Sequence, residues 1–394
     1  MLSSRQIFLN SIAQTSVAPL MLEIERAKGI YLYGVDGKKY IDLIAGISVS
    51  NLGHSHPKVV EAVKEQVEKY MHLMVYGEFV QSPQVRYAHR LIELLPASLN
   101  NVYFTNSGAE ATEGAMKLAK RFTGKTKFVS FKSSYHGSTQ GALSVMGDES
   151  FKRKFRPLLP DILQLEYGNE QGLDAIDQYT AAVILEPIQA ESGVTIPSDS
   201  FIKKLRTVCN DTGALLILDE AQTGLGRTGT LFAFEHYGIV PDILLLAKSL
   251  GGGMPLGAFI AAKEMMKSLS ENPALGHITT FGGHPVCCAA GLAALEVLLK
   301  ENLVSKVEEK GKLFDQLLNH PRIKSKRRIG LLMALEFDSF EQNKRIIDQS
   351  IELGLLTDWF LFAPHCMRIA PPLIISEDEI RTACKIILQA LEAN

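Results

Sequence analysis

The sequence predicts an α/β protein with a mostly parallel sheet, because short apolar runs alternate with amphipathic helical stretches between residues 102 and 261. The chain of 394 residues also exceeds the usual size of one domain, which favours two. From about residue 286 the alternation gives way to long helices and isolated strands. We therefore expect a large α/β domain over residues 57–285 and a smaller α+β domain formed by residues 1–56 and 286–394.

Composition and charge are those of an ordinary globular protein. Apolar residues make up 46% of the chain, charged residues 21%, and the formal net charge is −2. Like charges form no long block, so neither nucleic acid nor a membrane surface is an expected partner. No signal peptide is expected, because residues 1–6 are not followed by a long apolar core after a basic patch. No membrane span is expected, because glycines 251–253 and Pro255 interrupt the best apolar stretch.

The first elements are marked by turn and helix-start residues. Residues 29–44 predict two short strands around an Asp36-Gly37 turn. Pro57 is typical of a first helical position. The apolar face of the helix that it opens is expected to carry Val59, Val60, Val63 and Val67.

The large domain is expected to contain six apolar strands, at residues 102–104, 128–131, 182–185, 215–218, 243–246 and 257–261. The helix after the first strand should bury one side, formed by Ala111, Ala115, Leu118, Ala119 and Phe122. Ser198 is expected to cap another helix that ends near Gly213. Near the end of the chain, Ser376 and Glu379 form a capping-box pattern for the last helix.

A lysine and an aspartate carry the chemical prediction. Lys248 stands between the apolar run 242–246 and three glycines, and Asp219 ends the run 214–218. Ligands of open α/β sheets bind beyond the carboxyl ends of strands. Desolvation gives a lysine amine the neutral form that Schiff-base exchange needs, and a buried carboxylate needs a partner such as a protonated pyridine nitrogen. Both needs are met by pyridoxal phosphate (PLP), whereas the simpler alternative is a surface lysine at a strand end.

Two further segments fit a phosphorylated flat cofactor. Residues 105–110 lie between a strand and a helix, where free backbone N–H groups and the helix dipole favour a phosphate. The alternative is a plain helix cap by Ser107. Tyr135 follows a strand and can stack on a heterocycle, with His136 beside it, although each also fits a structural role.

Taken together, these motifs resemble the class III PLP-dependent aminotransferases of the ornithine and acetylornithine type. The likeness extends over nearly the whole chain and is carried by residues 106–110, 135–137, 186–189, 219–227, 247–257 and 279–285. It implies PLP-dependent fold type I, with a seven-stranded, mostly parallel sheet in the large domain. It also implies a homodimer with active sites at the subunit boundary.

The resemblance assigns cofactor roles. Lys248 would be the Schiff-base lysine and the base that moves the substrate proton, while Asp219 would pair with the pyridine nitrogen. Gln222 would bind the phenolic oxygen, and Tyr135 would stack on the ring with His136 beside it. The phosphate would be held by Ser107, Gly108 and Ala109, and by Thr280 of the partner subunit.

The resemblance also assigns substrate roles. Arg368 would receive a substrate carboxylate in a bidentate contact. Glu191 would pair with Arg368 when no carboxylate is present. One pocket could then accept an ω-amine first and a dicarboxylic oxo acid, 2-oxoglutarate, second. No metal ligand set is expected, and residues 53–57, with two histidines, are better explained as a turn before a helix.

The sequence departs from the acetylornithine and ornithine pattern at two positions. Ser138 stands where those enzymes carry an arginine that grips the α-carboxylate of the donor, and Ile47 lies near the position of a tyrosine in ornithine enzymes. Either another residue such as Lys132 replaces the arginine, or the donor has no α-carboxylate, as in putrescine or cadaverine. Residues 141–160 and 269–288 also resemble putrescine aminotransferases.

The expected function is therefore transfer of a terminal amino group from an acetylornithine-like, ornithine-like or diamine donor to 2-oxoglutarate, which gives an aldehyde and glutamate. One alternative is a PLP-dependent aminomutase of the same family. A second alternative is a non-catalytic PLP-binding subunit. The five cysteines show no paired metal spacing and fit free thiols in a reducing cytoplasm.

Overall fold

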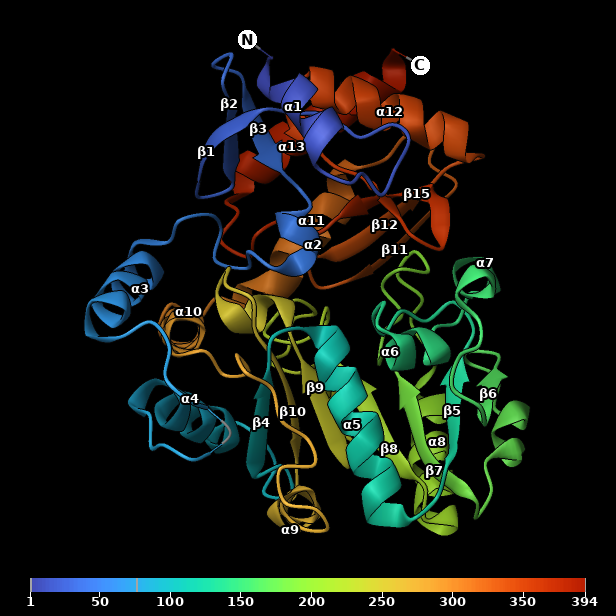
Figure 1. Cartoon of the computed structure of the whole chain (residues 1–394). Coiled ribbons are helices and arrows are strands. Elements are labelled where there is room, and N and C mark those ends of the chain that lie inside the picture. The colour runs from blue at the N-terminus through green and yellow to red at the C-terminus, as the bar shows by residue number, and fades with distance from the viewer. Residues whose placement is uncertain (1, 76, 394) are drawn as a thin grey trace.

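The computed structural model describes residues 2–75 and 77–393. Figure 1 shows a large sheet with its helices in the lower part of the view and a smaller body above it, where both termini lie. No helix within the described residues is long and apolar enough to cross a membrane.

The large sheet has seven strands in the order β4-β10-β9-β8-β7-β5-β6. Five of them, from β9 across to β6, pair in parallel, while β10 is antiparallel to both β4 and β9. The expected mostly parallel sheet is thus confirmed. The strands are β4 (Asn101–Thr105), β5 (Lys127–Phe131), β6 (Ile162–Leu165), β7 (Thr180–Leu185), β8 (Leu215–Asp219), β9 (Ile243–Leu246) and β10 (Gly257–Ala261).

The edge strand β6 was not expected from the sequence. All four of its residues are only partly buried, so its apolar run is short and interrupted by Gln164. The central strands are buried along their whole length, which gives them the continuous apolar runs typical of a parallel sheet covered on both sides.

Helices cover both faces of this sheet. Alternate residues of β7 and β8 belong to two separate apolar cores, as the two-residue period of a strand requires. One core contains α5 (Gly108–Thr123), and the other contains α8 (Asp199–Thr212). As expected, Ser198 caps α8 and Gly213 ends it in the left-handed conformation, with φ 68°.

Two expected helix faces need correction. Phe122 was expected on the buried side of α5 but is exposed, because it lies in the last turn of the helix. In α3 (Pro57–Lys69), Val59 is buried, whereas Val60 and Val67 are exposed. Val60 and Val67 are seven positions apart and form a second apolar stripe, which faces outward.

The N-terminal and C-terminal segments share a sheet in the smaller body. Its order is β1-β2-β3-β13, and β3 pairs in parallel with β13. The Asp36-Gly37 turn joins β2 and β3 as expected, whereas β1 was not foreseen. These strands are β1 (Ile24–Lys28), β2 (Tyr31–Gly34), β3 (Lys39–Asp42) and β13 (Leu355–Leu356).

A second small sheet has the order β11-β12-β15-β14 and carries the C-terminal helices (Figure 1). Its strands are β11 (Ser325–Ile329), β12 (Leu332–Glu336), β14 (Trp359–Phe360) and β15 (Ala363–Ile369). The helices beside it are α11 (Val307–Leu317), α12 (Phe340–Glu352) and α13 (Glu377–Glu392). The capping box of Ser376 and Glu379 at the start of α13 is confirmed.

The remaining α-helices are α1 (Ser4–Ser11), α2 (Ala45–Ser48), α4 (Ser82–Glu93), α6 (Gln140–Val145), α7 (Glu149–Lys152), α9 (Lys263–Lys267) and α10 (Pro285–Lys300). Of these, α1 and α2 lie in the upper part of Figure 1 and the others lie beside the large sheet. The long helix α10 packs against α3, α4 and the short 3-10 helix η4 (Lys248–Gly251). The division of the chain at residues 56 and 285 stays a prediction.

A buried arginine connects the two bodies. Arg227, which follows β8, donates through Nη1 to the carbonyls of Leu331 and Pro371 at 2.9 and 2.6 Å. Its Nη2 donates to Oδ1 of Asn51 at 2.6 Å. A buried charge is costly unless it is hydrogen-bonded, so these contacts hold the end of β8 against both parts of the smaller body.

Candidate active site

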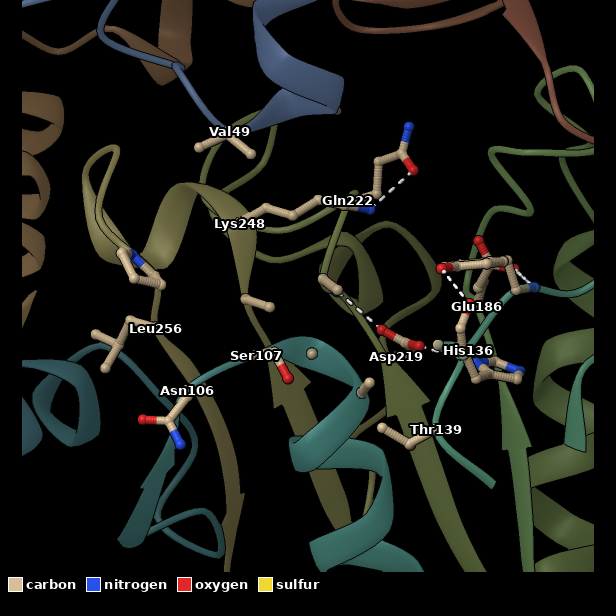
Figure 2. Close-up of a pocket in the computed structure, with 18 of the residues that line it drawn as sticks. Val49, Asn106, Ser107, His136, Thr139, Glu186, Asp219, Gln222, Lys248 and Leu256 are labelled. Carbon is tan, nitrogen blue, oxygen red and sulfur yellow. Dashed lines mark hydrogen bonds and ion pairs between the residues drawn. The ribbon is translucent and has the colours of Figure 1, made fainter. Parts of the chain in front are cut away.

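Lys248 follows β9 and enters a cavity of about 760 Å³. Its backbone has a φ of 51°, a left-handed conformation that is rare for residues other than glycine and that costs free energy. The side-chain Nζ donates to Oε1 of Gln222 at 3.1 Å. Figure 2 shows the two side chains reaching toward each other across the upper part of the cavity.

Asp219 ends β8, the strand beside β9. The register pairs Asp219 with Leu245, three residues before Lys248, so the acid and the amine lie at the same edge of the sheet. Its Oδ2 accepts a hydrogen bond from Nδ1 of His136 at 2.8 Å, and its Oδ1 accepts one from the backbone N–H of Ala221 at 3.0 Å. The structure thus assigns His136 a definite role, as the partner of Asp219.

The N-terminus of α5 forms the floor of the cavity. Ser107, Gly108 and Ala109 line it, and a Cβ at Gly108 would lie 3.2 Å from the Cβ of Ala247. Glycine therefore lets a ligand and the neighbouring backbone approach closely. Ser107 also caps the helix, because its Oγ accepts from the N–H of Glu110 at 3.2 Å. Ser107 can therefore cap α5 while the N-terminus of the same helix binds an anion.

The polar atoms around the cavity fit PLP. Among the described residues, Nε2 of Gln222 and Nε2 of His136 are buried without a hydrogen-bond partner. The amide nitrogen of Gln222 thus has no acceptor for its hydrogen bond, and the phenolate oxygen of PLP would supply one. The Asp219 carboxylate suits a protonated ring nitrogen, and the helix N-terminus suits a phosphate. Tyr135 lines the same cavity, where stacking on the ring remains a prediction.

Burial lowers the pKa of the Lys248 amine below its ordinary value of 10.5. The carboxylates of Glu191, Asp219 and Glu186 oppose this shift, and the charge of Arg368 adds to it. The net direction is downward, so the neutral amine is present at lower pH than in an exposed lysine. A neutral amine is the form that acts as a nucleophile or a base.

Arg368, on β15, and Glu191, on the segment after β7, form a buried bidentate ion pair. Nη1 of Arg368 lies 2.8 Å from one carboxylate oxygen of Glu191, and Nη2 lies 3.0 Å from the other. Burial raises the pKa of Glu191, but the charge and hydrogen bonds of Arg368 outweigh it and the net direction is downward. The sequence expectation that these two residues pair therefore agrees with the geometry.

Thr280 does not line the cavity of its own chain. It is exposed on the segment before α10, and its neighbour Thr279 accepts a hydrogen bond from Nδ2 of Asn106 at 3.0 Å. Asn106 does line the cavity. The contact of Thr280 with a partner's phosphate stays a prediction.

Glu186 is a site residue that the sequence analysis left without a role. It lines the cavity, and its Oε1 accepts from the N–H of Tyr135 at 3.0 Å. Burial raises its pKa to about 7. Glu186 directly follows β7 and Asp219 is the last residue of β8, so the rule that located Asp219 could also have located Glu186.

Lys132 is not a substitute for the missing arginine, and that alternative was wrong. Its amine is exposed and paired with the exposed carboxylate of Glu166. The chain turns after β5, and Lys132 lies outside the cavity wall, which includes Tyr135 and Ser138. Ser138 is exposed at this wall, with its Oγ 3.2 Å from the hydroxyl of Tyr135.

Comparison with known proteins gives consistent matches over almost the whole chain. Residues 12–391 match the family model described as "Aminotransferase class-III". An acetylornithine aminotransferase of Methanopyrus kandleri is 44% identical over 372 residues, which cover 93% of this chain and 93% of that protein. The acetylornithine aminotransferase of Methanocaldococcus jannaschii is 39% identical over 375 residues, covering 92% and 91%.

Solved structures agree with this. The ornithine aminotransferase of Toxoplasma gondii superposes with a TM-score of 0.92 at 31% identity, covering 100% of this chain and 96% of that one. An (S)-enantioselective ω-transaminase of Thermomicrobium roseum gives a TM-score of 0.89 at 28% identity, covering 100% and 99%. The expected fold type I is thereby confirmed.

If Lys248 bonds the cofactor and moves the substrate proton, replacing it by alanine should reduce turnover by at least about a thousandfold. The circular dichroism spectrum should stay that of the wild type. Lys132→Ala removes an exposed lysine outside the cavity and serves as the matched control, with wild-type turnover expected. Wild-type turnover in Lys248→Ala would contradict the site.

The raised pKa of Glu186 predicts a pH dependence of stability. The folded protein keeps a proton that the unfolded chain releases near 4.5, so this contribution is complete below 4.5 and is lost as the pH rises through about 7. Glu186→Gln imitates the protonated acid and should remove this dependence, which is at most roughly 3 kcal/mol.

The measurement is the unfolding midpoint of cofactor-free wild type and Glu186→Gln between about pH 5 and about pH 8. The midpoint of the variant should rise relative to the wild type as the pH increases. A constant difference between the two unfolding midpoints across this range would mean that the pKa of Glu186 lies outside it.

Proposed function

Because the chain belongs to the class-III aminotransferases, we propose that it transfers a terminal amino group from a small amine to 2-oxoglutarate and releases an aldehyde and glutamate. Membership confirms the family resemblance, the transaminase activity and the cofactor expected from the sequence, PLP. The substrates are accordingly an amine donor and an oxo-acid acceptor.

The cofactor residues divide the work. The N-terminus of α5 would hold the phosphate, Asp219 the ring nitrogen and Gln222 the phenolic oxygen. When bound, PLP withdraws electrons from the substrate bond that breaks. Asp219, fixed by His136, keeps its negative charge toward the ring, which favours the protonated ring nitrogen. Lys248, with its lowered pKa, can take a proton from the substrate carbon and return it.

The bidentate pair of Arg368 and Glu191 is the observation that carries the choice of acceptor. Buried guanidinium N–H groups without an acceptor are costly, so Glu191 binds the two Nη groups while an amine without a carboxylate occupies the site. A substrate carboxylate can take the same two N–H groups when Glu191 moves away. This exchange supports an acceptor that carries a carboxylate, as 2-oxoglutarate does.

The cavity wall favours a donor without an α-carboxylate. Ser138 occupies the wall, Val49 presents an apolar side chain, and Lys132 points elsewhere. Of the described residues that line the cavity, Lys248 is the only lysine or arginine; Arg368 lies outside this lining and is paired with Glu191. A carboxylate deprived of its cationic partner loses several kcal/mol of binding free energy, about 2–5. A diamine such as putrescine or cadaverine avoids that loss.

Acetylornithine is the second candidate donor. It is supported by the curated relatives, several of which are named acetylornithine aminotransferase and are 38–44% identical to this chain. An ornithine-like donor would use the same groups. The aminomutase and the non-catalytic subunit have less support, because the Arg368–Glu191 pair suits a second substrate and the Lys248–Asp219 set is complete.

We also propose that two copies of the chain share each active site. Large apolar side chains are exposed on the segment before and within α4 and on the segment that carries Thr280. These segments adjoin, since both line one surface cavity and the rings of His72 and Phe281 lie 4.8 Å apart. A contiguous apolar surface of this kind suits a second copy. The side chains are Met71, Leu73, Met74, Phe79, Val80, Val85, Leu275, Ile278 and Phe281.

We propose a cytoplasmic location because the cysteine thiols are unpaired. Cys209, Cys287, Cys288, Cys366 and Cys384 are all free and buried. Unpaired cysteines in this number are typical of a reducing compartment.

The first test of this function is Arg368→Ala, followed in each half-reaction by the absorbance of the cofactor. If the donor is a diamine, the half-reaction with 2-oxoglutarate should slow by about a hundredfold or more, since the carboxylate loses its bidentate partner. The half-reaction with the amine should change far less. Equal losses in both half-reactions would mean that Arg368 also reads a donor carboxylate.

A donor screen tests the part of the cavity wall that Ser138 forms. Wild type and Ser138→Arg are compared with putrescine, cadaverine, acetylornithine and ornithine, with 2-oxoglutarate as acceptor. Wild type should prefer the diamines, and Ser138→Arg should lower the Michaelis constant for acetylornithine by about tenfold because it supplies a cation for the α-carboxylate. Efficient acetylornithine turnover by wild type, unimproved by the arginine, would select the second candidate.

A further inference from the structure

The guanidinium of Arg368 has a second carboxylate partner that the pair with Glu191 does not require. Oδ1 of Asp358 accepts a hydrogen bond from Nε of Arg368 at 2.8 Å. The carbonyl of Trp359 accepts another from Nη2 at 3.2 Å. Glu191 thus binds the terminal edge of the guanidinium, where a substrate carboxylate would bind, while Asp358 binds the Nε side.

The two carboxylates differ in how they are attached to Arg368. The backbone N–H of Arg368 donates to the carbonyl of Asp358 at 2.9 Å, and Thr357 Oγ1 donates to the carbonyl of Arg368 at 2.5 Å. Asp358 directly precedes β14, which pairs with β15. Asp358 is therefore fixed to the strand that carries Arg368. Glu191 comes from a separate segment, after β7. Its carboxylate also accepts from the N–H of Leu361 at 3.0 Å, so a departing Glu191 side chain breaks that bond but none of the bonds between Asp358 and Arg368.

The surroundings of the guanidinium support a fixed orientation. Phe360 lies against it, with the guanidinium carbon 4.5 Å from the ring centroid. Arg368 is 2% exposed, so any N–H group that loses its partner loses it in a nearly dry environment. The planar group presents its donors in a fixed fork, and fixing Nε on one side sets the direction of the two Nη groups on the other.

We propose that Asp358 is a positioning residue that keeps the Arg368 guanidinium aimed at the substrate when Glu191 leaves, and that its charge sets how tightly the acceptor carboxylate binds. The proposal rests on the proposed role of Arg368. With Glu191 in place, one positive charge faces two negative charges. When a substrate carboxylate replaces Glu191, the same balance returns, so the exchange proceeds without a change of net charge at the buried site.

A consequence is that Asp358 weakens carboxylate binding while it orients it. An arginine paired only with the substrate would hold 2-oxoglutarate, and equally the product glutamate, more tightly. The carboxylate of Asp358 repels the incoming carboxylate across the guanidinium, which favours release of the product. Burial raises the pKa of Asp358, and the adjacent charge of Arg368 opposes that rise.

Two substitutions separate orientation from charge. Asp358→Asn keeps an oxygen that can accept from Nε but removes the charge, whereas Asp358→Ala removes both. The probe is glutarate, a dicarboxylate without a reactive carbonyl or amine, and its Kd for the holoenzyme is measured by calorimetry. The Michaelis constant for the acceptor oxo acid is measured on the same variants.

Asp358→Asn should bind glutarate about tenfold more tightly than wild type, and its Michaelis constant for the acceptor oxo acid should fall in parallel. Asp358→Ala should bind at least about tenfold more weakly than Asp358→Asn, because the guanidinium is no longer oriented. Tighter binding in one variant is a result that damage to the fold does not produce. Equal Kd values in the three proteins, or weaker binding in Asp358→Asn, would overturn the proposal.

Two controls complete the experiment. Asp242→Asn removes another aspartate that pairs with an arginine at 2.8 Å, Arg206, at the amino end of β9, and should leave the Kd of glutarate unchanged. Arg368→Ala should abolish glutarate binding. If Arg368→Ala retained it, the role of Arg368 itself would fail, an outcome distinct from a failure confined to the Asp358 variants.

Discussion

The parallel pairing of β8 with β9 is the constraint on which the site depends. It aligns the ends of two buried strands, so that an acid and an amine at those ends enter one cavity. β7 is followed by Glu186 at the same edge, and the N-terminus of α5 lies there too. None of these groups needs an irregular fold to reach the others, because the carboxyl ends of parallel strands meet at one edge of the sheet.

The cost of this arrangement is a high density of buried charge. Each ionised group is stabilised locally: Asp219 by His136 and a backbone N–H, and Arg368 by two carboxylates. Such pairs contribute little net stability, because desolvation consumes much of the Coulomb attraction. Their contribution is to orientation and to exchange. In the proposed function the Arg368 cluster exchanges one carboxylate for another, whereas Asp219 keeps its contact with His136.

The sequence predicted the central parts of this structure because they depend on local pattern. Continuous apolar runs located β7, β8 and β9, and residues at their ends located Lys248 and Asp219. Edge strands such as β6 were missed because half-exposed strands have short, interrupted runs. Asp358 was missed because its partner is set by the pairing of β14 with β15, which no local signal reveals. Lys132 was misjudged since chain proximity to Tyr135 does not fix the direction of a side chain.

The account rests on Lys248 as the residue that bonds the cofactor. Its direct test is reduction of the PLP-loaded protein with borohydride, followed by mass-spectrometric mapping of peptides that carry a pyridoxyl group. The label is expected on the peptide that contains Lys248, in stoichiometric amount. A label on another lysine, such as the buried Lys152, or no label at all, would contradict the account.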